Sequence, residues 1–299
     1  MIRCRARAGF TLIELLIVVS IIALLVSILA PSLGSARDAA GMVLCANHQR
    51  NLAIGWNLYC LDNRDVALPG RFGANGEGTD TYWVGNGMKY RPRWVAGMGV
   101  LTGAIPFANP SPTKANGGDR QDYANEVYKC PAVPERIDER NYAYGYNYQF
   151  LGNARNSAKG SGYRNFPVLI GSIRALSSTV MAGDSMGTAA AFPALERTPY
   201  SNDGSDARSL SNHGWSLDPP RLTAGSDRGP GETPGDPRIA VDPRHRGKVT
   251  VSFCDGHVNS LLPEELGYDV APDGRFTDAG NNRMFSPRGD DADPPPVWQ

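Results

Sequence analysis

The chain has 299 residues, which suits one sizeable domain or two small ones. Apolar side chains make up 41% of it, enough for a packed core, while 34 Gly and 23 Pro indicate a loop-rich body and argue against a helical bundle. Thirty basic residues balance thirty acidic ones, so a general nucleic-acid binder, which needs a positive surface, is not expected.

The N-terminus combines a short basic leader with a long apolar run. Residues 1–9 carry three arginines and no acid, and residues 10–30 follow with a single charge, Glu14. At about 1.5 Å per residue, a helix over this run is about 30 Å long, the thickness of one bilayer core. Because basic residues that flank a span stay in the cytoplasm, we expect a single pass through the inner membrane, with the remaining chain outside the cytoplasm.

A conventional signal peptide cut near Ala30 or Ala36 and a plain signal anchor are the alternatives for this segment. The Gly9-Phe10 pair directly before the run, and Glu14 inside it, argue against both. A carboxylate in hydrocarbon is costly and should have a partner. If the chain is cut after Gly9, the new amino group of Phe10 lies about one helical turn from Glu14 and can pair with it, on the same chain or on a neighbour.

The sequence GFTLIE at residues 9–14 resembles the processing motif of type IV prepilins and type II secretion pseudopilins. The resemblance implies that a prepilin peptidase cuts after Gly9 and methylates Phe10, and that Glu14 guides addition of the subunit to a filament. Pro31 falls where many members of the family have a helix-kinking proline. The fold implied is α+β and pilin-like, with a long N-terminal helix packed on a small antiparallel β-sheet head.

Residues 32–64 are predicted to continue this helix beyond the membrane as a stalk. Mostly apolar side chains form one stripe along it: Leu33, Ala36, Ala40, Leu44, Leu52, Trp56 and Tyr59. The polar run at residues 62–65 and Pro69-Gly70 predict its end. Cys45 and Cys60, 15 residues apart on the helix, are separated by more than about 20 Å and cannot bridge each other.

Four cysteines remain once Cys4 leaves with the leader, and they are Cys45, Cys60, Cys130 and Cys254. An even count in an exported domain permits disulfides without requiring them. Proteins that resemble this one often carry a cysteine at the start of this segment and a later Cys-Pro, here Cys45 and Cys130-Pro131. The resemblance therefore implies a Cys45–Cys130 disulfide, and free buried thiols are the alternative.

Residues 65–262 are expected to form a globular head. A short strand is predicted near residues 82–84, and the short apolar runs at 168–170 and 178–182 predict two more. Tyrosines alternate at positions 142, 144, 146 and 148, which predicts a strand with one packed face, although such a row could also stack on sugars. The Ser-, Asp-, Gly- and Pro-rich segment between residues 200 and 244 predicts a long surface loop or partial disorder.

The clearest signal in the head is a β-hairpin. Residues 249–253 alternate in polarity, Asp255-Gly256 predicts a two-residue turn with φ > 0 at both positions, and residues 257–261 return as the partner strand. His245, nine residues and then Asp255-Gly256 resemble the H-x9-DG signature of a large group of bacterial prepilin-type proteins. Residues 263–299 depart from that group and are predicted to be a loop-rich tail.

Few residues suggest chemistry. His245, Asp255, His257 and Asp184 could converge on zinc or iron, but turn and hydrogen-bonding roles explain them more simply. Six tail aspartates could bind calcium, although they lack an ordered loop pattern: Asp269, Asp273, Asp278, Asp290, Asp291 and Asp293. Ser185 lacks the flanking glycines of a nucleophile elbow. We therefore predict no catalytic residues and no cofactor or metal, with calcium in the C-terminal loop as the alternative.

The favoured function is a structural subunit of a type II secretion or type IV pilus-like system. Its expected partners are prepilin peptidase, other pilin-like subunits and the membrane, and no nucleic acid is expected. The main alternative is a surface module that binds carbohydrate, peptide or metal and uses the N-terminal segment only as an anchor. A signal-anchored hydrolase is a third class, which predicts turnover by the purified head.

Overall fold

The computed structural model describes residues 10–72, 81–113, 120–140, 142–156, 162–165, 168–201, 204–223, 226 and 237–294, with the backbone alone at 153–156 and 162–165. The chain divides into two compact units, Met1–Gly41 and Met42–Gln299. Gly9 and the other leader residues lie outside the described part.

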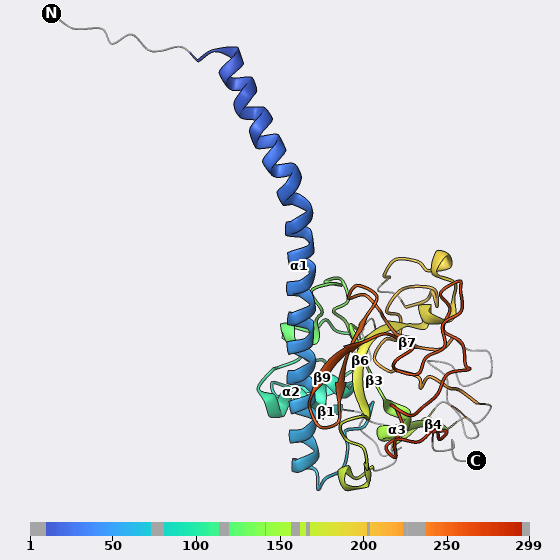
Figure 1. Ribbon diagram of the computed structural model, residues 1–299. Coiled ribbons are helices and arrows are strands. Elements are labelled where there is room, and N and C mark those ends of the chain that lie inside the picture. Colours follow the sequence, from blue (N-terminus) through green and yellow to red (C-terminus); the bar gives the residue numbers. More distant parts are fainter. Residues whose placement is uncertain are drawn as a thin grey trace, which may run out of the picture. The chain divides into compact units, whose positions relative to one another are not determined.

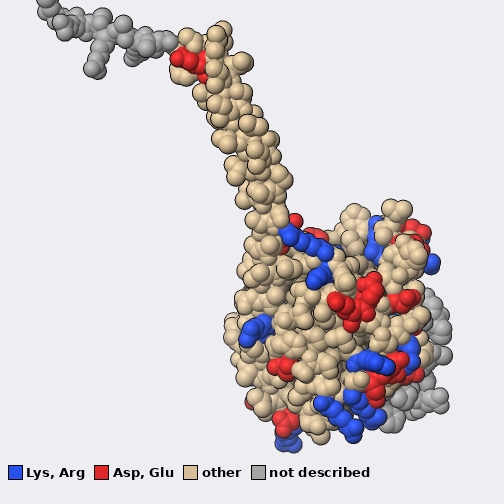
Figure 2. All heavy atoms as spheres, in the orientation of Figure 1, with Lys and Arg blue, Asp and Glu red and all other residues tan. Residues whose placement is uncertain are grey.

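The first unit contains the N-terminal part of the helix α1, which runs Leu12–Asp62 (Figure 1). Every residue from 10 to 38 is exposed, and this part of α1 is long and apolar enough to cross a membrane. Figure 2 shows its uncharged surface, since no acidic or basic residue occurs between Glu14 and Arg37. The helix continues through Pro31, so the boundary expected near this residue is not a break in the helix.

In the second unit, the C-terminal part of α1 packs one face against the head. Its buried residues lie on one helical face, since each has another buried residue three or four positions away: Cys45, Gln49, Leu52, Ala53, Gly55, Trp56 and Cys60. The predicted stripe was right at Leu52 and Trp56, but its N-terminal half was wrong, because four of its residues are exposed: Leu33, Ala36, Ala40 and Leu44. Gln49 lies on the buried face because its amide nitrogen donates to Asp184 and to the Thr250 carbonyl, two hydrogen bonds that an apolar pattern does not reveal.

An antiparallel five-stranded sheet forms the centre of the head, in the order β3-β6-β8-β9, with β7 pairing on β6. The strands are β3 (Tyr144–Tyr146), β6 (Val180–Gly187), β7 (Ala240–Val241), β8 (Val249–Phe253) and β9 (Val258–Leu261). The helix and sheet make an α+β, pilin-like arrangement, as predicted.

Shorter elements surround the sheet. The α-helices are α2 (Trp94–Thr102) and α3 (Tyr148–Leu151), and the two-stranded pairs are β1 (Thr81–Trp83) with β2 (Met88–Tyr90) and β4 (Asn153–Asn156) with β5 (Gly162–Asn165). The 3-10 helices are η2 (Glu126–Tyr128), η3 (Ile170–Ser172), η4 (Thr188–Ala191) and η5 (Ala194–Glu196). The strand predicted near residues 82–84 is confirmed as β1. The strand predicted at 168–170 is wrong, because η3 begins there.

Both faces of β8 are buried, which the alternating sequence did not predict. Val249, Val251 and Phe253 pack in one cluster with tail residues such as Leu266 and Phe285, while Cys254 belongs to the cluster that contains the buried face of α1. The polar residues Thr250 and Ser252 are also fully buried. The head therefore has a core on each side of its sheet.

The hairpin is confirmed in place, but its turn differs from the prediction. Phe253 N donates to the His257 carbonyl, and Gly256 N donates to the Phe253 carbonyl. Of the two predicted central residues, only Gly256 has positive φ, at 95°. The Asp255 carboxylate instead accepts from His257 N at 3.1 Å, so a side-chain contact takes the place of the second left-handed residue.

The tyrosine row is a strand only at Tyr144–Tyr146, and Tyr148 begins α3. All four tyrosines of the row are buried, as a packed face requires, but Ala143 and Asn147 between them are buried as well, so both faces are packed where one was predicted. Trp94 stacks on Tyr146 with ring centroids 5.2 Å apart, and the Tyr146 hydroxyl donates to the Leu68 carbonyl. These contacts make the row part of the core and leave no exposed aromatic face for sugar.

The segment between residues 200 and 244 is not the surface loop predicted, where it is described. Trp215, Leu217, Ile239 and Val241 are buried in it. Asp218 explains how an irregular segment enters the core, because its carboxylate accepts from Ile239 N at 2.7 Å. The tail is loop-rich as expected, yet it also contributes buried Leu266, Tyr268, Phe276 and Phe285.

Candidate functional site

Thr11 and Glu14 cap the N-terminus of α1. Thr11 N and its hydroxyl donate to Glu14 Oε2 at 2.9 and 2.7 Å, and Glu14 N donates to Thr11 Oγ1 at 3.2 Å. This reciprocal arrangement is a capping box, which satisfies amide groups at the first turn. Phe10 lies directly before it and is 74% exposed. Glu14 thus has a local partner in Thr11.

A second candidate site lies inside the head, where four side chains from distant segments meet. Cys45 comes from α1, Cys130 from the loop after η2, Asp184 from β6 and His245 from the segment before β8. All four are buried, and their potential ligand atoms lie within 4.8 Å of one another. The two sulfur atoms are 2.7 Å apart, and the Cys45 thiol donates toward Cys130.

Asp184 is the polar centre of this cluster. Its Oδ1 accepts from Arg244 Nη2 at 2.7 Å and from Gln49 Nε2 at 3.2 Å, and its Oδ2 accepts from Thr250 N at 2.8 Å. His245 Nε2 lies 3.5 Å from Oδ2. Burial raises the pKa of Asp184, and the Arg244 guanidinium opposes that shift.

The pairing of β6 with its neighbours explains how Asp184 reaches these partners. Tyr144 stands opposite Asp184 in the β3–β6 register, and Gly183 stands opposite Val251 in the β6–β8 register. The amide of Thr250, next to Val251, therefore reaches the carboxylate from β8.

The two cysteines differ in their electrostatic surroundings. Hydrogen bonding from Cys45 holds the pKa of Cys130 well below its usual range, with Arg244 and His245 acting in the same direction. His245 Nε2 lies 3.7 Å from Cys130 Sγ. Burial, by contrast, raises the pKa of Cys45, which also lies 3.2 Å from the Tyr144 hydroxyl. The arrangement favours a thiolate at Cys130 beside a thiol at Cys45.

Only part of the metal set considered from the sequence comes together. His245 and Asp184 meet, but Asp255 and His257 lie at the hairpin tip, where their side chains pair at 2.6 Å and are partly exposed. Sequence reasoning did not place Cys45, Cys130 and Arg244 in this cluster. The resemblance had paired the two cysteines, which was the one available signal; in the structure both are free thiols in contact with each other.

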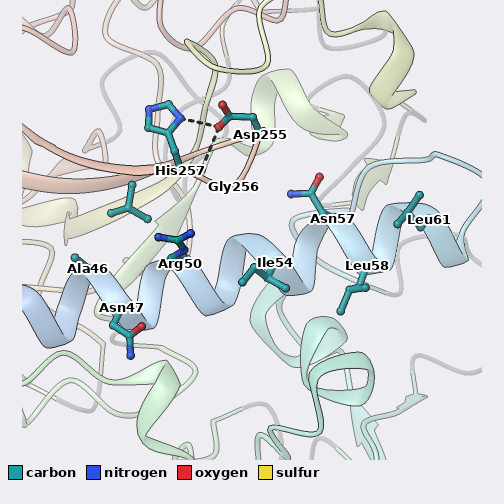
Figure 3. A pocket seen from close by; sticks show the side chains of 11 residues that line it. Ala46, Asn47, Arg50, Ile54, Asn57, Leu58, Leu61, Asp255, Gly256 and His257 are labelled. Atoms are coloured by element: carbon teal, nitrogen blue, oxygen red, sulfur yellow. Dashed lines mark hydrogen bonds and ion pairs between the residues drawn. The ribbon is translucent and has the colours of Figure 1, made fainter.

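An open groove of about 720 Å³ lies between α1 and the hairpin tip (Figure 3). Arg50, Ile54 and Leu58 line it from α1, and Asp255 and His257 line it from the hairpin. Asn57 holds the two elements together, because its amide donates to the Cys254 carbonyl at 3.3 Å.

The six tail aspartates have separate contacts. Asp291 and Asp293 pair with Arg221, Asp278 with Arg238, and Asp273 with Arg275. Thr277 donates to Asp269, and Ser286 donates to Asp290. These contacts give the acids structural roles in holding an irregular tail.

Comparison with protein families matches residues 4–30 to the prokaryotic N-terminal methylation motif. Comparison with curated proteins found no match, and comparison with solved structures found none either. The matched segment contains residues 4–9 of the basic leader, the Gly9-Phe10 junction and the apolar part of α1. The motif match supports a prepilin-like protein, and α1 is a candidate membrane anchor.

Proposed function

We propose that this chain is a structural subunit of a type II secretion or type IV pilus-like assembly. A prepilin peptidase cuts it after Gly9 and methylates Phe10. The mature protein sits in the inner membrane by the N-terminal part of α1, with the head outside the cytoplasm, and joins other pilin-like subunits through that helix.

The observation that carries this proposal is the methylation motif, followed by an apolar helix whose side chains are exposed along residues 10–38. Every residue from 10 to 38 is exposed, including many Leu, Ile and Val side chains. Water cannot solvate such a surface at low cost, so lipid covers it before assembly and neighbouring helices cover it afterwards. The role is structural, and energy for assembly comes from other proteins.

Glu14 provides the test, because its two roles can be separated. Glu14→Gln keeps an acceptor for Thr11 and preserves the capping box, but it removes the charge that would pair with the amine of Phe10. We expect the variant to be processed and membrane-bound yet to lose cross-linked multimers. Thr11→Ala is the matched control, since it breaks part of the cap and keeps the carboxylate. Unchanged multimers in Glu14→Gln would refute assembly through this charge.

The groove beside α1 supports a second candidate, a surface module anchored by the same helix. Its lining combines apolar Ile54 and Leu58 with charged Arg50 and Asp255, a mixture suited to a peptide or sugar. This function predicts that Glu14→Gln changes nothing, whereas Ile54→Asp abolishes ligand capture by the intact protein.

A further inference from the structure

We propose that Cys45 and Cys130 are joined by a disulfide that fastens α1 to the loop before β3, and that His245 and Arg244 are positioning residues for it. The inference does not depend on the proposed assembly function. It assigns a chemical role to the His245 end of the hairpin signature, beyond closing the turn.

The distance between the two sulfur atoms is the first argument. At 2.7 Å they are far closer than the roughly 3.5–4.0 Å of ordinary non-bonded contact. A disulfide bond is about 2.05 Å long, so a small side-chain adjustment completes it. The two residues are 85 positions apart in sequence, and both side chains are fully buried. The tertiary fold, and not closeness in the sequence, therefore brings the two thiols into contact.

A metal ion is the competing occupant of the same cluster. Two sulfur ligands of a tetrahedral zinc ion lie about 3.8 Å apart, so the observed pair would have to separate by about 1 Å. The carboxylate of Asp184 is already engaged on both oxygens by Arg244 and the Thr250 amide. A metal would have to displace or share these contacts and would place a cation beside Arg244. The geometry thus favours the covalent bond.

The different surroundings of Cys130 and Cys45 indicate which of the two sulfur atoms attacks the oxidant first. Cys130, as thiolate, attacks one sulfur of an incoming protein disulfide, which is the oxidant, and the other oxidant sulfur leaves as a thiolate. Cys45 then gives up its proton to that thiolate and attacks Cys130 Sγ, which releases the second oxidant sulfur. Two electrons pass to the oxidant, which ends as one thiol and one thiolate, and the thiolate takes up a proton from water. Because both cysteines are fully buried in the folded head, the oxidant reaches them in a nearly folded head, in which Arg244 and His245 already flank Cys130 but the surrounding chain has not yet closed.

Arg244 and His245 keep Cys130 in place for this step. Arg244 Nη2 donates to the carboxylate of Asp184, and Asp184 in turn lies 3.5 Å from the His245 ring. The same ring reaches Cys130 Sγ at 3.7 Å. The positive groups stabilise a thiolate facing Cys45, and neither of them forms or breaks a bond.

The direct test is peptide mapping of the full chain, expressed in cells with an oxidising compartment outside the cytoplasm and extracted in detergent. The sample is alkylated in denaturant without reductant and digested. We expect a linked Cys45–Cys130 peptide, lighter by its two lost hydrogen atoms, and alkylated Cys60 and Cys254. Alkylation of both Cys45 and Cys130, or one tightly bound zinc per chain by elemental analysis, would overturn the proposal.

Three variants serve as controls and as a fallback for this test. Cys60→Ala removes a buried thiol from the same helix and should leave the link intact, whereas Cys45→Ala should leave Cys130 alkylated. If Cys45→Ala fails to accumulate, His245→Gln retains both thiols. During oxidative refolding with oxidised glutathione, it should form the link several-fold more slowly than the wild type. An unchanged rate in His245→Gln would contradict the positioning role.

Discussion

Arg244 and Asp184 form an ion pair at 2.7 Å inside the head, with side chains 6% and 0% exposed. The pair joins the start of the hairpin segment to the central strand β6. Its carboxylate also accepts from Gln49 of α1, so a single acid ties together three segments that are distant in sequence. The head is organised around this polar centre as much as around its apolar clusters.

Removal of the cation from this pair should be strongly destabilising. Arg244→Met leaves Asp184 buried with its charge uncompensated, and loss of one partner of such a pair costs about 3–5 kcal/mol. The unfolding midpoint of the full chain in detergent, followed by tryptophan fluorescence in urea, measures the effect. Arg275→Met is the matched control, because its pair with Asp273 lies at the surface and should contribute nothing measurable.

Glu139 should make stability depend on pH. Burial raises its pKa to about 7, although Lys89 lies 2.6 Å away and opposes the shift. Between the ordinary value of 4.5 and about 7, the folded state holds a proton that the unfolded state has lost. Stability therefore falls as pH rises through this window and is level above it.

The variant Glu139→Gln tests this assignment, since it removes the titrating group. Wild type should unfold at a lower urea concentration at pH 8 than at pH 5, and the variant should lose most of that difference. An equal difference in both proteins would assign the pH dependence to other groups, among them Asp184.

His245 should also control how easily the proposed disulfide is reduced. The positive surroundings of Cys130 stabilise its thiolate, which favours the reduced form. His245→Gln should shift the equilibrium with dithiothreitol toward the disulfide by roughly tenfold. His257→Gln, at the partly exposed hairpin tip, serves as the control and should not change it. A shift toward the dithiol would show that His245 stabilises the bond.

Loss of the disulfide should destabilise the head but leave processing intact. Cross-links that close long loops contribute about 2–4 kcal/mol. Excess dithiothreitol should therefore lower the unfolding midpoint of wild type, and Cys45→Ala should show no further decrease on reduction. An identical response of the two proteins to the reductant would assign its effect to another site.

Sequence patterns within one segment predicted α1 and the β8–β9 hairpin, whose formation depends mainly on neighbouring residues. The apolar run and the polar residues after it predicted α1, and the alternation around Asp255-Gly256 located the β8–β9 hairpin. The turn type was missed because an Asp255 side-chain contact substitutes for a left-handed backbone. The burial of Thr250 and Ser252 was missed because polarity does not reveal a partner in another segment.

The polar cluster could be predicted only in pieces. Its residues come from positions 45, 130, 184 and 245, and no spacing rule brings such positions together. The resemblance paired the cysteines, but the contact of Asp184 with Arg244 depends on the register of β6 and β8. The burial of the segment around Trp215 could not be predicted for the same reason. It depends on a hydrogen bond between distant residues, in which the Asp218 carboxylate accepts from the backbone amide of Ile239.

The central claim is that this chain is a processed prepilin-like subunit, and its most direct test is the mature N-terminus. Intact mass and N-terminal sequencing of protein extracted from membranes should show a chain that begins at methylated Phe10. A chain that begins at Met1, or one that begins beyond Ala30, would contradict the account.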